Sequence, residues 1–319
     1  MKPFQPDKYE IILRKIGPDS REHYVVCNNE TDECALLYNK KEIDDASFYA
    51  PHLMTSIGNK IGIKVPKTEV GYMLHKDIDK TSYSATFFES TLVYIEDTMK
   101  MAFLYTNLAF VHQDVIQSIY YEENPEIGKS RDIDIYNGID IDDYINSYIH
   151  FLTTRGEENP GEVRQEIIDR IIFDLKLGIK GINNIKLRNN KNAELQPHYL
   201  SSGMLGLNLR KEWINQELEK EEQEFTKDIE NEFKPQFKLS GKRERASTSE
   251  ILKYLLEKYP EQTRKAHKKV EKFKEEDLKR ELENCEGIEE FHKEFALKVF
   301  SSRNKEFEEI IERTIEEER

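Results

Sequence analysis

The chain has 319 residues, of which 37% are hydrophobic and 34% are charged, and its formal net charge is −14 at pH 7. This length suffices for two domains, or for one two-lobed domain with an appendage. A strongly negative chain repels phosphates, which argues against non-specific nucleic-acid binding.

The cysteine count and the hydropathy of the chain indicate the cellular compartment in which we expect the protein. The three cysteines, Cys27, Cys34 and Cys285, are an odd number in a long chain, which argues against a disulfide framework and fits a reducing cytosol. Cys27 and Cys34 have no His or Cys partner at zinc-ligand spacing. The N-terminal MKPFQPDKYE has no apolar core of signal-peptide length, and no run of about 18 apolar residues occurs. We therefore expect a cytoplasmic protein with no membrane partner and no metal site.

The first hundred residues are typical of strands arranged around one helix. Apolar residues recur at near-helical spacing over 44–63, where Asp44 or Asp45 is the expected N-cap and Pro51 marks the first turn. β-Branched and aromatic residues between turn signals predict strands at 9–16, 22–29, 33–40, 65–75 and 83–97. This order predicts a sheet-rich α+β lobe over 1–100.

The next region, 101–207, turns helical. Residues 102–123 are rich in aromatic side chains and ambiguous in period, whereas 140–153 and 161–178 are amphipathic helices. The second of these carries one broad apolar stripe, and Gly178 is a natural C-terminal stop. After it, NIKLRN and AELQPHY predict a short hairpin over a polar NNKN turn.

The last region, 208–319, is predicted to be nearly all helix, with few apolar positions and many Lys and Glu residues four apart. Hydroxyl caps open a helix at 247–259, and two helical segments, 289–300 and 307–318, end the chain. These helices either pad the second lobe, which we favour, or form an interaction surface. The basic stretch KLSGKRER (238–245) is interpreted as a solvated linker.

Three landmarks, in order, resemble the HipA-like serine/threonine kinase family of bacteria. The first is the strand HYVVCNN, followed by a helix and the phrase GIKVPKTEVGYM. The second is SATFFESTLVYIED, and the third is IIFDLKLG with NIKLRNNKNAELQPHYLSSGMLG. The resemblance implies a two-lobed kinase-like fold with a nucleotide-holding, sheet-rich N-terminal lobe. It implies a catalytic helical lobe behind it, here extended by the charged helical tail.

The positions that matter for phosphoryl transfer do not match this family. Its catalytic loop reads Gly-Asn-x-Asp-x-His-x-x-Asn; if Gly178 is the glycine, the catalytic aspartate becomes Gly181 and the metal-binding asparagine becomes Lys186. If NIKLR is the anchor instead, these two positions become Ile179 and Asn184. Neither Gly nor Ile accepts a proton, so the catalytic base is missing in both registers.

Two further positions of the family pattern depart from it. Leu200 stands at the second metal ligand and cannot bind magnesium, and Cys27 stands nearest to the phosphate-binding lysine. No Asp occurs between Asp174 and Asp228. The chain is therefore predicted to be a pseudokinase, with no catalytic residue and no metal ligand.

Polar groups nevertheless remain near the expected cleft. The candidate nucleotide-binding residues are Cys27, Lys180, Asn183, Asn184, Lys186 and Ser201. His198, between a proline and a tyrosine, is interpreted as a surface or packed residue. We expect no cofactor, and ATP with Mg²⁺ only if the chain is an active kinase.

Three hypotheses stay open. The first is a regulatory or interaction pseudokinase with a protein partner and weak or no nucleotide binding. The second is an active, atypical kinase whose carboxylates are relocated to the Asp-rich stretch 131–144. The candidate carboxylates there are Asp132, Asp134, Asp140, Asp142 and Asp143. The simpler interpretation of this stretch, which we favour, is helix caps and a solvated strand edge. The third is an unrelated α+β interaction module that works through its charged tail.

Overall fold

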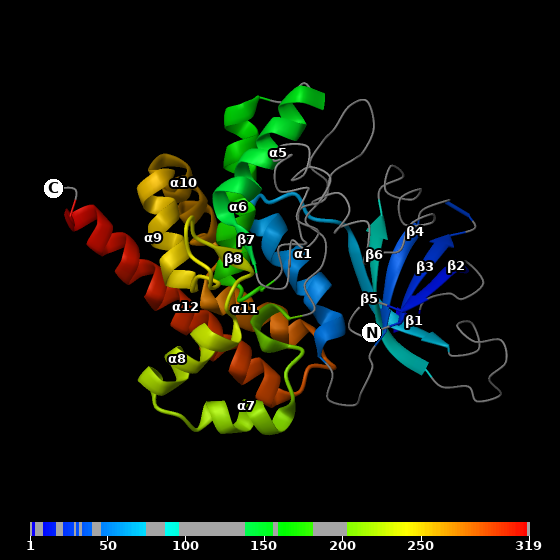
Figure 1. The fold of residues 1–319 in the computed structure, drawn as a ribbon. Coiled ribbons are helices and arrows are strands. Elements are labelled where there is room, and N and C mark those ends of the chain that lie inside the picture. The colour runs from blue at the N-terminus through cyan, green and yellow to red at the C-terminus, as the bar shows by residue number, and fades with distance from the viewer. Residues whose placement is uncertain are drawn as a thin grey trace.

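A computed structural model of the chain describes residues 2–3, 9–16, 22–28, 30–31, 34–39, 46–74, 87–95, 138–155, 159–180 and 203–317. Figure 1 shows a sheet on one side, a body of helices on the other, and one helix, α1, between them. The termini lie far apart, with the C-terminus at the outer end of the helical body.

The sheet has six strands in the order β1-β5-β6-β4-β3-β2. All neighbours are antiparallel except β1 and β5. The five strands expected from the sequence are present, together with the short β1. Their bounds are β1 Lys2–Pro3, β2 Tyr9–Ile16, β3 Glu22–Asn28, β4 Cys34–Asn39, β5 Thr68–Leu74 and β6 Phe87–Ile95.

Helix α1, Ala50–Ile61, packs on β5 and β6 and also contacts α11 of the helical body. A 3-10 turn, η2 (Ser47–Tyr49), leads into it, and Pro51 lies in its first turn, as expected. Its N-cap is Tyr49, and Asp44 and Asp45, the expected caps, lie outside the described residues. The helix ends at Gly62, whose φ of 78° is left-handed and favours glycine.

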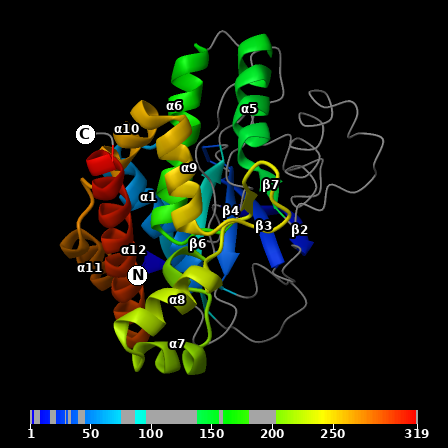
Figure 2. The same ribbon diagram turned by 60° about the vertical axis from the view of Figure 1, so that its left-hand side comes forward.

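The helical body begins at β7 (Ile139–Asp140) and ends near the C-terminus. Its remaining elements are α5 Ile141–Arg155, α6 Pro160–Lys176, η5 Met204–Gly206, α7 Lys211–Leu218, α8 Glu222–Glu232, β8 Phe237–Lys238, α9 Thr248–Lys258, α10 Pro260–Val270, α11 Glu275–Asn284 and α12 Glu290–Glu317. β7 and β8 pair in parallel. Figure 2 shows α5 and α6 standing side by side, with α10 and α12 on the other side of α6.

Helix α6 is buried over more of its circumference than the predicted apolar stripe. Asp169, Arg170 and Lys176 are at most 5% exposed, although all three are charged. The reason is that α5 and α10 both pack against α6 and cover its polar flanks. Two of these charges have partners: Lys269 binds the Asp169 carboxylate, and Glu166 accepts a hydrogen bond from Arg170 Nη2 at 2.5 Å.

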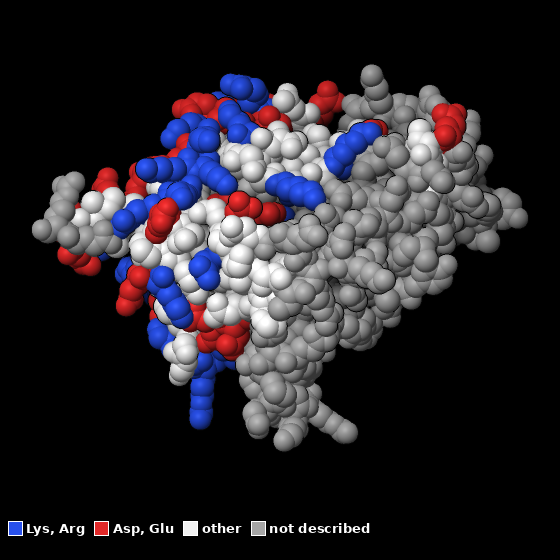
Figure 3. Space-filling model, turned by 90° about the horizontal axis from the view of Figure 1, so that it is seen from above, with Lys and Arg blue, Asp and Glu red and all other residues white. Residues whose placement is uncertain are grey.

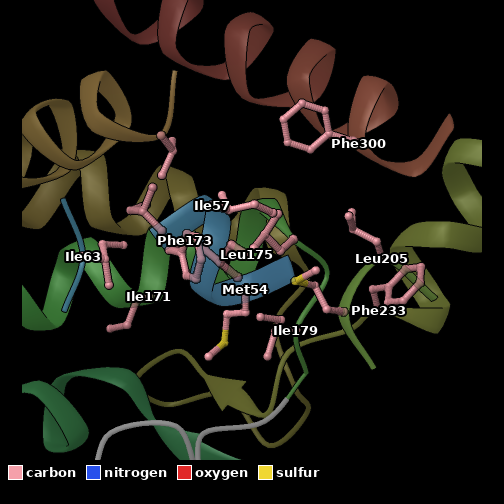
Figure 4. Close-up of a cluster of buried hydrophobic side chains, with 14 of the residues drawn as sticks. Met54, Ile57, Ile63, Ile171, Phe173, Leu175, Ile179, Leu205, Phe233 and Phe300 are labelled. Carbon is pink, nitrogen blue, oxygen red and sulfur yellow. The ribbon is translucent and has the colours of Figure 1, made fainter. Parts of the chain in front are cut away.

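One hydrophobic cluster joins α1 to the C-terminal helices. Figure 4 shows part of it: Met54 and Ile57 of α1 lie close to Phe173 and Leu175 of α6, with Phe300 of α12 beyond them. Burying each side chain of this size contributes about 1.5–3 kcal/mol. The C-terminal helices therefore supply core as well as surface.

The C-terminal end differs from the sequence expectation. The two predicted segments, 289–300 and 307–318, form one 28-residue helix, α12. The polar stretch between them stays helical because Arg303, only 1% exposed, reaches Glu306 at 2.6 Å and the Ile229 carbonyl at 3.5 Å. No helix among the described residues is long and apolar enough to cross a bilayer.

Candidate functional site

The candidate site lies beyond the C-terminal end of α6. Asn159 caps the start of that helix by accepting a hydrogen bond from Gly161 N–H at 2.8 Å. At its other end the chain turns at Gly178, whose φ is 65°, and Ile179 N–H donates to the Asp174 carbonyl at 2.8 Å. A Cβ at Gly178 would lie 3.0 Å from the Phe233 ring, so both the turn and the packing require glycine.

The two ends of segment 181–202 are held at neighbouring points of the fold. Leu205 N–H donates to the Leu177 carbonyl at 2.9 Å, and Gln236 N–H donates to the Lys180 carbonyl at 3.0 Å. Leu205 has a φ of 51°, which is uncommon for a non-glycine residue and is maintained by its complete burial. The base of the expected catalytic loop is therefore a fixed feature of the core.

Lys180, expected to contact phosphate, is already paired. Its Nζ lies 2.6 Å from a Glu232 carboxylate oxygen and 5.8 Å from the centre of the Phe233 ring. Both members of the pair are partly exposed, so the pair is worth about 1 kcal/mol or less. A bound anion would have to compete with Glu232 for this ammonium group.

Cys27, which the sequence predicts to stand nearest to the family's phosphate-binding lysine, lies on β3 and is 6% exposed. It is disulfide-bonded, and the residue opposite its Cα in the β3–β4 ladder is Cys34. The odd cysteine count argued against a disulfide framework and gave no sign of this single bonded cysteine, while Cys285 is a free, buried cysteine. The odd count missed this because a single cross-strand pair needs only two cysteines placed opposite each other.

The remaining candidates lie outside the described residues: Asn183, Asn184, Lys186, His198 and Ser201, with the non-matching positions Gly181 and Leu200. Ile179, the position that one register assigns to the catalytic aspartate, is described. It is 4% exposed and belongs to the hydrophobic cluster. Figure 4 shows its side chain near Met54 and Leu175.

The Asp-rich stretch is described only from Gly138 onward. Asp140 Oδ1 accepts hydrogen bonds from the N–H groups of Asp142 at 2.9 Å and Asp143 at 3.3 Å, so it caps the start of α5. Burial raises the pKa of Asp140, although these two N–H groups act to lower it. Asp132 and Asp134 lie outside the described residues.

Asp142 joins α5 to α9 and to the start of α10. Asp142 is 9% exposed, and its carboxylate is bound by the Tyr254 hydroxyl, by the Lys258 ammonium and by the Tyr259 hydroxyl, the last at 3.1 Å. These partners follow Asp142 by more than 110 residues, so no local pattern signalled them. Among the described residues, no group of three or more His, Cys, Asp or Glu side chains is arranged to hold a metal ion.

The chain is similar to a solved structure over nearly its whole length. That structure is the crystal structure of a Helicobacter pylori proinflammatory kinase, CtkA; the TM-score is 0.65 with 14% identity, over 95% of this chain and 97% of that chain. The fold is kinase-like.

This kinase-like fold agrees with the resemblance read from the sequence and disagrees with an unrelated α+β module whose likeness to a kinase is chance. No protein-family model matches the chain, and no curated protein matches it. At this low identity the similarity concerns the fold only.

Proposed function

We propose that the chain is a HipA-like pseudokinase that acts by binding a protein partner. The observation that carries the proposal is the mismatch between a kinase-like fold and the residues at its chemical positions. The position of the catalytic aspartate is Gly181 or Ile179, and that of the second metal ligand is Leu200. None of these side chains carries an oxygen that binds Mg²⁺ or accepts the proton of an attacking hydroxyl.

Three described residues support it. Ile179 is packed into the core, Lys180 is paired with Glu232, and Cys27 is neither a cation nor a free thiol. Asp140 and Asp142, which the active-kinase hypothesis needs as relocated ligands, are engaged in capping α5 and in binding α9. Among these five residues, few charged groups would therefore be available to bind a phosphate or its metal ion.

The test is thermal unfolding with ATP, with and without Mg²⁺. We expect the melting temperature to stay within about 1 °C of the ligand-free value, because a site without metal ligands should not bind Mg·ATP and is therefore not stabilised by it. An intact site at a ligand concentration of about 100 times its Kd would raise it by about 4 °C. A Mg²⁺-dependent rise of that size, with phosphate transfer to serine or threonine, would contradict the pseudokinase and favour the active kinase.

Binding of ATP without Mg²⁺ would allow the role of Lys180 to be tested. If ATP binds without Mg²⁺, the substitution Lys180→Ala should weaken it severalfold, whereas Lys227→Ala, an exposed lysine on α8, should not. Equal affinities for both variants would remove Lys180 from the site.

A further inference from the structure

Basic side chains concentrate beside the candidate site. Residues 234–245 contain five Lys or Arg residues and a single acidic residue, Glu244, in a chain of net charge −14. We name residues 238–245 the cationic loop; its four basic residues are Lys238, Lys242, Arg243 and Arg245. From the sequence alone, this stretch is interpreted as a solvated linker.

The cationic loop has a fixed base and an exposed tip. Its first residue belongs to β8, which pairs in parallel with β7, and Ala246 N–H closes the loop by donating to the Phe237 carbonyl at 2.8 Å. Phe237 is 7% exposed and packs edge-on against Tyr144 at 5.2 Å. At the tip, Gly241 has a φ of 79°, and residues 240–244 are exposed. Such a loop presents its charges at a defined place.

That place adjoins the candidate site. Gln236, just before β8, donates to the carbonyl of Lys180, the last described residue before segment 181–202. On the other side, a Cβ at Gly138 would lie 2.9 Å from Arg245 Cγ and 3.3 Å from Lys238 Cγ. Figure 2 shows the loop beside β7. The basic side chains therefore lie where the chain enters the expected catalytic loop.

Most of these charges have no acidic partner among the residues that the structure describes. Lys242 pairs with Glu250 at 2.7 Å. Lys238, Arg243 and Arg245 form no ion pair with any carboxylate that the structure describes. The larger basic surface over α9 and α10, at the left of Figure 3, is different because Asp and Glu lie among its cations. There Lys265 pairs with Glu261 and Lys269 with Asp169.

We propose that the cationic loop docks an acidic segment of a protein partner beside Lys180, at the base of the expected catalytic loop. This rests on the proposed function, since it names the chemistry of the partner that the pseudokinase binds. An acidic segment would give Lys238, Arg243 and Arg245, which have no ion-pair partner among the described residues, charge-assisted hydrogen bonds, and each arginine can make two of them to one carboxylate. A nucleic acid fits less well, because its long phosphate backbone would extend over the surface of a chain carrying −14.

The test is fluorescence anisotropy of a labelled decaglutamate peptide with the full chain. We expect it to bind, a decaglutamine peptide not to bind, and added salt to weaken the complex. The double substitution Arg243→Gln with Arg245→Gln should weaken binding by roughly tenfold. The matched control is Lys268→Gln with Lys272→Gln, which removes the same charge from exposed positions on α10 and in the turn after it, and should change the affinity by less than about twofold.

Three outcomes would overturn the proposal. The peptide fails to bind, or the α10 control weakens binding as much as the loop variant does, or a labelled oligothymidylate binds more tightly than decaglutamate and responds to the loop variant. Thermal unfolding of both variants checks that they fold. The Mg·ATP experiment does not use this loop, so a catalytically active chain and a failed docking surface give distinguishable results.

Discussion

A single buried lysine illustrates what the fold imposes on individual residues. Lys176, at the end of α6, is 4% exposed, and its Nζ lies 4.7 Å from the centre of the Phe307 ring of α12. Burial lowers its pKa to about 8, although Glu308 and Glu271 act to raise it. His267 of α10 stacks on the same ring, and burial lowers its pKa to about 4. Burial around the Phe307 ring therefore destabilises the charged forms of both Lys176 and His267.

Lys176→Met should stabilise the protein at neutral pH. The unfolded lysine binds its proton up to its ordinary pKa of 10.5, so the cost of burying the charge is complete at pH 7 and is relieved as pH rises from about 8 to 10.5. A shift of this size corresponds to about 3 kcal/mol, from which the lost contact with Phe307 subtracts about 1 kcal/mol. Urea unfolding should therefore show the variant more stable at pH 7 by about 2 kcal/mol.

The pH profile distinguishes this cause from better packing. The difference in unfolding free energy between Lys176→Met and the natural chain should shrink between about pH 8 and about pH 10. An exposed control, Lys268→Met, should show no such trend. A constant difference across that range would mean that the charge of Lys176 is not what limits stability.

At the scale of elements, α1 is tied to the C-terminal helices at both of its ends. Near its start, Gly287 N–H donates to the Tyr49 hydroxyl at 3.1 Å, and Tyr49 is 1% exposed. Near its end, Lys60 pairs with Asp277 at the start of α11 and lies 5.8 Å from the centre of the Phe273 ring. The helix that packs on the sheet is therefore also positioned by residues more than 200 places later in the chain.

Asp277 has two tasks, and its removal should cost more than that of its partner. Its carboxylate accepts the Lys274 N–H at 3.0 Å, which caps α11, and also binds Lys60. Asp277→Ala should lower the free energy of unfolding by about 1–2 kcal/mol, whereas Lys60→Ala should lower it by less than about 1 kcal/mol. Chemical denaturation measures both, and the exposed neighbour Glu276→Ala is the control. Equal losses for Lys60 and Asp277 would assign the whole effect to the ion pair.

For the whole molecule, the continuous core implies cooperative folding of the helical body. The hydrophobic cluster includes residues from α1, α6 and every helix from α7 to α12. Gly206 illustrates the closeness of this packing, because a Cβ there would lie 2.4 Å from the Phe295 ring of α12. Without the C-terminal helices, the buried faces of α1 and α6 would meet water.

A chain that ends at residue 207 should therefore fail to fold. We expect it to be insoluble or to lack a cooperative thermal transition by circular dichroism, since it loses the partners of Ile167 to Ile172 in α10 and α12. A chain that ends at residue 311 keeps the last buried residue, Ile311, and should melt as the full chain does. A soluble, cooperatively melting 1–207 fragment would show that the tail is a separate unit.

The local elements could be read from the sequence because their causes are local. Apolar periodicity predicted α5, α6 and α9, and β-branched runs predicted the strands from β2 to β6. The hydroxyl cap at Ser247 is present as a capping box with Glu250, and the stop at Gly178 is a left-handed turn. The ordered motifs also predicted the kinase-like character of the fold, which the solved kinase shares.

Contacts between distant segments needed the tertiary structure. Asp142 was a candidate ligand until Tyr254, Lys258 and Tyr259 were brought to it, and Lys180 was a candidate phosphate contact until α8 brought Glu232 to it. The chemistry of a charged side chain depends on which opposite charges the fold places within a few ångströms and on how much water it excludes. The sequence alone determined which groups the chain possesses and the local elements that carry them; the packing of α1, α6 and the C-terminal helices decided which of those groups are already occupied.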